Sequence, residues 1–131
     1  MSVPFDPSIL TRRTIKDLST KAWHLVKPVG DDDLNFTGLG DLPIGALTDD
    51  VADGTTSAVY LPVQIGGIIK VKCVGAITAG SLAGSDAAGL AIAVVGNHAG
   101  GNNGHVFGIA LGTYAANEVG AFLWSPSWVE V

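Results

Sequence analysis

Short apolar segments separated by glycine and polar turns run through most of the sequence. Those rich in Val, Ile, Leu and aromatic residues predict β-strands at 22–27, 44–47, 58–64, 68–77, 90–95, 106–111 and 121–125. Pairs such as Asp53-Gly54 and Gly66-Gly67 separate the strands, because these residues adopt a positive φ at low steric cost. The spacing is typical of an all-β fold, a small β-barrel or sandwich of short antiparallel strands. No gap between strands holds a convincing crossover helix, which disfavours a parallel βαβ arrangement.

The first 20 residues depart from this pattern, and we interpret them as an N-terminal arm before a single β domain at 21–131. They contain Pro4 and Pro7, mixed charges and scattered apolar residues. A helix is the alternative, with Asp6 as its N-cap and Pro7 in its first position. The pattern favours an extended arm, with or without one or two helical turns. It leads into the strand at 22–27, which we expect to be stopped by Pro28-Val29-Gly30.

A weak internal echo accompanies the strands. The segment PIGAL at 43–47 is followed by a polar turn and the strand 58–63, and FGIAL at 107–111 is followed by a turn and the strand 121–124. A glycine inside each apolar segment indicates a bulge or a close approach of two backbones. The echo is equally compatible with an internal duplication and with chance.

Composition and charge narrow the function classes. The chain has 131 residues, of which 47% are hydrophobic. It contains one cysteine, Cys73, so it cannot form an internal disulfide. We expect Cys73 to be a small buried residue. Five of the seven Lys and Arg fall within residues 1–27 beside two Asp (5 − 2 = +3), which leaves 2 − 10 = −8 for residues 28–131. An acidic body disfavours nucleic-acid binding, so we expect the basic arm to meet an acidic protein surface. Neither a secretion signal nor an apolar run of about 18 residues is present, so we expect no membrane contact.

Catalytic and ligand-binding motifs fail in their details. His98 and His105 lie in an Asn/Gly-rich loop without the further ligands of a zinc site. The calcium-loop-like DDDLN at 31–35 has Phe36 and Leu42 where glycine and glutamate are needed. No phosphate loop is present, GSLAG at 80–84 lacks the first glycine of a nucleophile elbow, and the carboxylates cluster in turns. We therefore expect no enzyme, no metal and no cofactor.

The order of the motifs over 21–125 resembles the tailed-phage head decoration proteins, also called capsid cement proteins. The resemblance lies in WHLVK at 23–27, LPIGAL at 42–47, GGIIKV at 66–71, GAITAGSL at 75–82 followed by DAAG at 86–89, FGIAL at 107–111 and the strand 121–124. Ser81 stands where the family usually has Asp, the loop at 96–105 is long, and residues 1–20 have no counterpart.

The resemblance implies a virion protein on the outer surface of the head that clamps neighbouring major capsid subunits against the pressure of packaged DNA. It implies a homo-oligomer, expected as a trimer, without an active site. We expect the capsid or oligomer interface to include Phe5, Ile9, Arg12, Arg13, Trp23 and Trp128. The alternative is a tail or fibre domain that binds a host glycan or protein through Trp124 and Trp128, and a small hydrolase is the remaining hypothesis.

Overall fold

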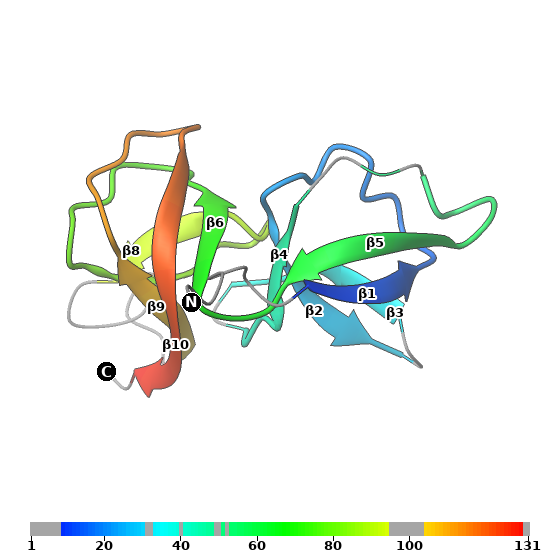
Figure 1. Ribbon diagram of the computed structural model, residues 1–131, viewed down its shortest axis with the longest axis horizontal. Helices are drawn as coiled ribbons and strands as arrows, with labels where there is room; N and C mark the ends of the chain where they lie inside the picture. Colours follow the sequence, from blue (N-terminus) through cyan, green and yellow to red (C-terminus); the bar gives the residue numbers. More distant parts are fainter. Residues whose placement is uncertain are drawn as a thin grey trace, which may run out of the picture.

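The computed structural model describes residues 9–30, 33–39, 41–48, 51, 53–94 and 104–129. Within these residues the chain forms ten β-strands and no helix, which confirms the predicted all-β fold (Figure 1). The described residues therefore include no helix long and apolar enough to cross a membrane. In chain order the strands are β1 (Ile9–Thr14), β2 (Leu25–Val29), β3 (Asp33–Phe36), β4 (Gly45–Leu47), β5 (Val59–Gln64), β6 (Ile68–Lys72), β7 (Leu82–Ser85), β8 (Ala91–Val94), β9 (Gly104–Ala110) and β10 (Val119–Val129).

Strands β1 to β5 close into a small barrel in the order β1-β3-β2-β4-β5. The ring closes through β1, which pairs antiparallel with β5 and parallel with β3. Side chains alternate along β5, where Leu61 and Val63 are buried and Tyr60 is exposed. The buried residues fill the interior with branched aliphatic side chains: Leu18, Val26, Leu34, Leu47, Leu61 and Val63.

Strands β6 to β10 repeat this arrangement. Their sheet has the order β6-β10-β9-β7-β8, and a parallel bridge between Cys73 and Ala91 joins β8 to the end of β6. Read around that ring, the order is β6-β8-β7-β9-β10, which is the order of the first barrel with each number raised by five. Phe107 and Phe122 pack edge to face within the second core, with their ring centroids 5.2 Å apart. The chain thus contains two five-stranded units, 9–64 and 68–129, joined by residues 65–67.

The pairing register is also common to the two units. Ile9 lies opposite Gln64 in the pair that closes the first unit, and Ile68 lies opposite Leu123 in the second. The other strand pairs correspond in the same way: β2–β4 corresponds to β7–β9, β4–β5 to β9–β10, and β2–β3 to β7–β8. The sequence echo between 43–47 and 107–111 falls on the equivalent strands β4 and β9, with Gly45 and Gly108 at equivalent positions.

Glycine is required at the same place in both units. A Cβ on Gly45 would lie 1.9 Å from the carbonyl oxygen of Gln64, and a Cβ on Gly108 would lie 2.1 Å from that of Leu123. Ordinary contacts between carbon and oxygen begin at about 3.3 Å. Neither position can therefore carry a side chain unless its strand moves away from the neighbouring strand. This confirms the close backbone approach that was predicted from the glycines inside these strands.

Backbone hydrogen bonds hold the two units against each other. The amide of Leu25 in β2 donates to the carbonyl of Gly89 at 2.7 Å, and the amide of Lys72 in β6 donates to the carbonyl of Trp23 at 2.9 Å. Gly89 has a φ of 82°, and a Cβ there would lie 2.7 Å from the carbonyl oxygen of Leu25. The turn between β7 and β8 therefore reaches β2 only because this residue is glycine.

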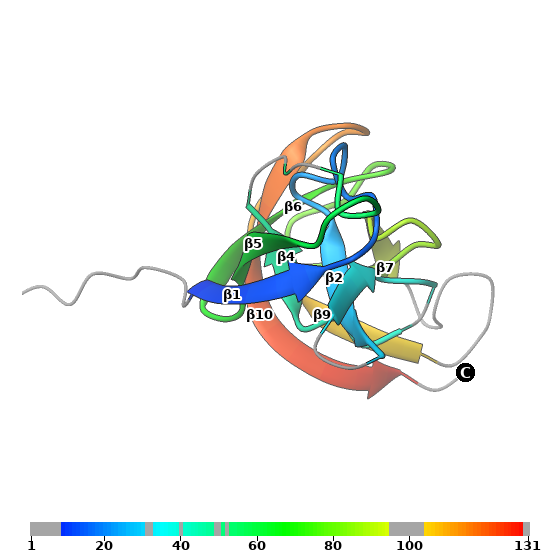
Figure 2. The same cartoon turned by 90° about the vertical axis from the view of Figure 1, so that its right-hand side faces the viewer.

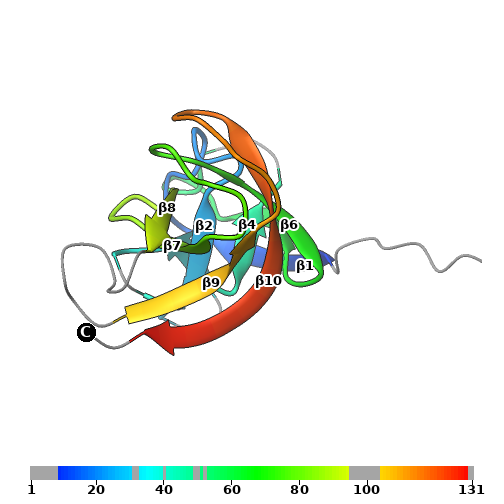
Figure 3. The same ribbon diagram turned by 90° about the vertical axis from the view of Figure 1, so that its left-hand side faces the viewer.

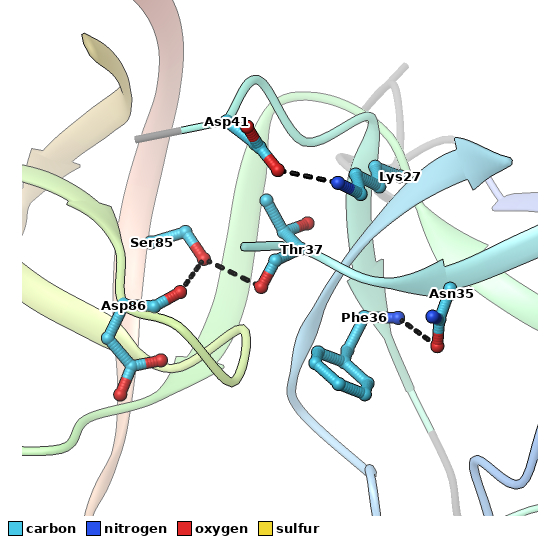
Figure 4. A network of polar contacts seen from close by, with 7 residues as sticks. All are labelled: Lys27, Asn35, Phe36, Thr37, Asp41, Ser85 and Asp86. Carbon is cyan, nitrogen blue, oxygen red and sulfur yellow. Dashed lines mark hydrogen bonds and ion pairs between the residues drawn. The ribbon is translucent and has the colours of Figure 1, made fainter. Parts of the chain in front are cut away.

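Side-chain contacts add to this junction around the end of β3 (Figure 4). The Ser85 hydroxyl, at the end of β7, lies 2.9 Å from the carbonyl oxygen of Asp86 and 3.4 Å from that of Thr37. On the first unit, Lys27 forms an ion pair with Asp41. Together these contacts connect the β3–β4 segment both to β2 and to the second unit.

The structure corrects the expected arm. Residues 9–14 form β1, which is an integral strand of the first barrel, and residues 1–8 lie outside the described residues. The strand is hard to predict from the sequence because it contains two adjacent arginines, Arg12 and Arg13. In the structure Arg13 forms an ion pair with Asp33 on the neighbouring strand β3, at 2.8 Å. Residues 33–36, which overlap the acidic segment DDDLN, form β3, and residues 82–85, for which no strand was predicted, form β7.

The predicted strand at 22–27 is displaced along the chain. Trp23 belongs to a turn, and β2 begins at Leu25. The expected stop at Pro28-Val29-Gly30 comes slightly too early, because Pro28 of β2 still pairs with Leu34 of β3 and β2 ends at Val29. Cys73 is fully buried as expected, and burial raises the pKa of its thiol above the ordinary value of 9.0.

Candidate interaction face

The pair β1–β5 of the first unit and the equivalent pair β6–β10 of the second unit lie on the same side of the molecule. Figure 1 looks onto β1, β5, β6 and β10, and Figures 2 and 3 show them together along one edge. Their outward side chains follow from the pairing register and the alternation along each strand. We call this side the front face and define it by Ile9, Thr11, Arg13, Tyr60, Pro62, Ile68, Lys70, Lys72, Val119, Ala121 and Leu123.

Charge is segregated onto this side of the protein. Strands β1 and β6 carry Arg12, Arg13, Lys70 and Lys72, whereas β1, β5, β6 and β10 contain no Asp or Glu. These four strands therefore have a formal charge of +4, in a chain whose net charge is −5. The remaining residues carry 3 − 12 = −9. The contrast attracts an acidic partner surface to these strands in preference to the rest of the molecule.

Large apolar side chains are exposed beside these cations. Tyr60 is 70% exposed, Ile9 and Ile68 are 52% and 50% exposed, and Leu123 is 43% exposed. Apolar residues bordered by charge mark protein contact surfaces more often than surfaces that bind nucleic-acid backbone. The front face therefore has the chemistry of a protein-binding surface.

A hollow of about 220 Å³ lies at the first unit's end of this face, lined by Thr11, Arg12, Arg13 and Tyr60. Arg13 and Tyr60 face each other across β1 and β5. The Nε of Arg13 donates to Asp33 at 2.8 Å, and the Arg13 side chain remains 42% exposed. The hollow thus combines a held guanidinium with an exposed phenol ring.

A second hollow of about 400 Å³ lies where the two units meet, lined by Ser19, Thr20, Ala22, Trp23, Lys72, Asn117 and Val119. Among the described residues, Trp23 (φ 66°) and Asn117 (φ 69°) are the non-glycine residues with a positive φ, and both line this hollow. A left-handed backbone costs a bulky residue such as tryptophan about 1–2 kcal/mol. The amide of Trp23 donates to Leu47 at 2.7 Å and its carbonyl accepts from Lys72, which maintains the conformation.

The described residues contain no group of three or more His, Cys, Asp or Glu that could hold a metal ion. The buried His24 lies at the junction, with its Nδ1 2.8 Å from the carbonyl oxygen of Ala88. Burial lowers the pKa of His24 below 6.5, and the charges of Lys21 and Lys72 act in the same direction. His24 is therefore a structural residue of the junction.

The structure brings together most of the residues proposed from the sequence as interface residues. Ile9 and Arg13 lie on the front face, Arg12 lines the first hollow and Trp23 lines the second. Phe5 lies outside the described residues, and Trp128 lies in β10 with a side chain that the structure does not describe.

Sequence reasoning missed Tyr60, Lys70, Lys72 and Leu123. The alternation I-x-K-x-K at 68–72 was the available signal, because it places isoleucine and both lysines on one side of a strand. The absence of acidic residues from all four strands is a second signal, but it has meaning only once the strands are known to lie together.

Comparison with known proteins supports the fold. No protein-family model matches the sequence, and no curated protein matches it. Among solved structures, the fold is similar to that of the N base of the head fibre protein gp8.5 of bacteriophage phi29, with a TM-score of 0.68 and 16% sequence identity. The alignment covers 90% of this chain and 93% of that chain. The two chains, this one and the phi29 N base, thus share an arrangement of strands over nearly their whole lengths.

Proposed function

We propose that this protein is a structural protein of a tailed-phage head, located on the outer surface of the shell as a decoration protein. The front face carries the proposal, because it joins three cations, Arg13, Lys70 and Lys72, to exposed apolar residues in an otherwise acidic chain. The likeness to a phage head fibre base adds support, since it relates the complete fold to a protein of that setting. The motif order over 21–125 points the same way.

In this proposal the front face binds the major capsid protein and clamps neighbouring capsid subunits. Apolar contacts supply affinity, and the cations orient the protein on an acidic capsid surface. Many copies on one shell make a modest affinity per copy sufficient. Self-association, expected as a trimer, would use exposed apolar residues away from the front face, namely Leu39, Leu82 and Leu111.

The direct test uses heads of the encoding phage that have been emptied of DNA and lack this protein. We expect the purified chain to co-sediment with the heads and to appear in a cryo-EM map as density on the outer surface. Deletion of residues 1–8 tests the arm without removing β1, whereas deletion of residues 1–20 would also remove a barrel strand. Failure of the complete chain to bind such heads would reject the proposal.

A fibre base is the second candidate, and the known role of the similar phi29 protein favours it. In the same map, a decoration protein would give only compact density near the shell, whereas a fibre base would carry density that projects beyond it. The glycan-binding form of this alternative assigned a role to Trp124, which is half-buried and packs on Phe107 at 6.3 Å between ring centroids. Loss of glycan binding in Trp128→Ala would support that form, and a glycan array without signal would exclude it.

A further inference from the structure

The repeated fold gives the front face two equivalent halves. The first ribbon is formed by the outward residues of β1 and β5, and the second ribbon by those of β6 and β10. Ile9 and Ile68 occupy the same register position and are exposed to nearly the same extent, 52% and 50%. Arg13 and Lys72 likewise occupy one register position, so each ribbon places a cation four residues after its exposed isoleucine.

The two hollows follow the same equivalence. The first involves the pair Arg13 and Tyr60, and the second involves the equivalent pair Lys72 and Val119. Each ribbon therefore presents the same sequence of features: an apolar end, a central polar position and a hollow beside a cation. Duplicated strands alone would not require that the surface chemistry also be conserved between the copies.

We infer that the two ribbons are two docking sites for one kind of partner, an acidic and apolar segment presented by neighbouring, identical capsid subunits. This inference rests on the proposed function. Cations beside exposed isoleucines fit a segment that combines carboxylates with apolar side chains. The hydrogen-bonded junction holds both ribbons on one side of the molecule, so a single chain can engage two subunits together.

The ribbons differ in how their cations are held. Arg13 already pairs with Asp33, whereas the position equivalent to Asp33 in the second unit is Leu90, which has no charge. Among the described residues, Lys70 and Lys72 have no ion pair. We therefore expect partner binding through the second ribbon to weaken more strongly with increasing salt concentration than binding through the first ribbon.

The equivalent isoleucines provide a matched test. Ile9→Asp and Ile68→Asp each place a carboxylate in one ribbon, and Leu42→Asp is the control because Leu42 is 45% exposed outside both ribbons. Circular dichroism and thermal unfolding verify that the variants fold. We expect each ribbon variant to bind emptied heads about 100-fold more weakly, because the loss of one site removes the gain from bivalency. The double variant should not bind detectably, and the control should bind normally.

Cross-linking tests whether both ribbons recognise the same segment. In Arg13→Lys, a carbodiimide can join an amine of either ribbon to a nearby capsid carboxylate, and mass spectrometry identifies the joined peptides. We expect Lys72 and the substituted position 13 to link to one and the same capsid segment. Links to two unrelated segments, or normal head binding by either Ile→Asp variant, would overturn the inference and leave the proposed function intact. A wild-type chain that does not bind heads would instead reject both.

Discussion

The most exacting prediction concerns Gly108, where β9 passes close to β10. In Gly108→Ala the new Cβ would lie 2.1 Å from the carbonyl oxygen of Leu123, more than 1 Å closer than an ordinary contact of about 3.3 Å. The contact atom belongs to the backbone, so the strands themselves must separate. Overpacking costs about 1–3 kcal/mol, and two weakened ladder hydrogen bonds cost about 1 kcal/mol each. We expect the free energy of unfolding to fall by about 3–5 kcal/mol, a large part of a total near 5–15 kcal/mol.

Chemical denaturation followed by tryptophan fluorescence measures this loss. Gly66→Ala is the control, because a Cβ there has no atom within 4 Å and the residue does not have a positive φ. The control should change the free energy of unfolding by less than about 1 kcal/mol. If Gly108→Ala and Gly66→Ala unfold at the same denaturant concentration with equal slopes, the close approach of β9 and β10 is not a feature of the folded protein.

Three further predictions concern turns and the junction. Tyr114→Phe removes a hydroxyl that accepts from the Ala121 amide at 2.9 Å, and denaturant titration should show a loss of about 1–3 kcal/mol. Asn117→Ala places at a φ of 69° a residue that tolerates the left-handed region less well than Asn, so its thermal midpoint should fall, and an unchanged or higher midpoint would contradict this. Burial lowers the pKa of His24, so the unfolded chain takes up its proton first as the pH falls. The free energy of unfolding should therefore decrease below pH 6.5, and His24→Gln should flatten this dependence between pH 8 and pH 5.

Strands with a strong apolar pattern could be predicted from the sequence, and the others could not. β5 and β9 were found because Val, Ile, Leu and Phe dominate them. β1 carries two arginines and β7 is small-residue rich, so in both strands the pairing with neighbours outweighs a weak local preference. The left-handed Trp23 could not be predicted at all, because only contacts from both units maintain that conformation.

The candidate face shows the same division. Ile9, Arg12, Arg13 and Trp23 were proposed from the sequence, through a basic stretch and an aromatic residue that stand out locally. Lys70 and Lys72 are scattered among apolar residues, and their significance comes from a fold that places β6 beside β10 and on the same side as β1. The duplication was visible only as a faint echo, because pairing register is conserved where residue identity is not.

The three-residue link between the units has a mechanical consequence. Fully extended, residues 65–67 span about 10 Å, so the two units cannot be drawn far apart without pulling β5 or β6 away from its neighbours. Figure 1 shows β5 running toward the link along the line between the units, so tension between them loads the β1–β5 ladder lengthwise. Bonds perpendicular to such a pull must break together rather than one at a time. We therefore expect the connection between the two units to resist stretching.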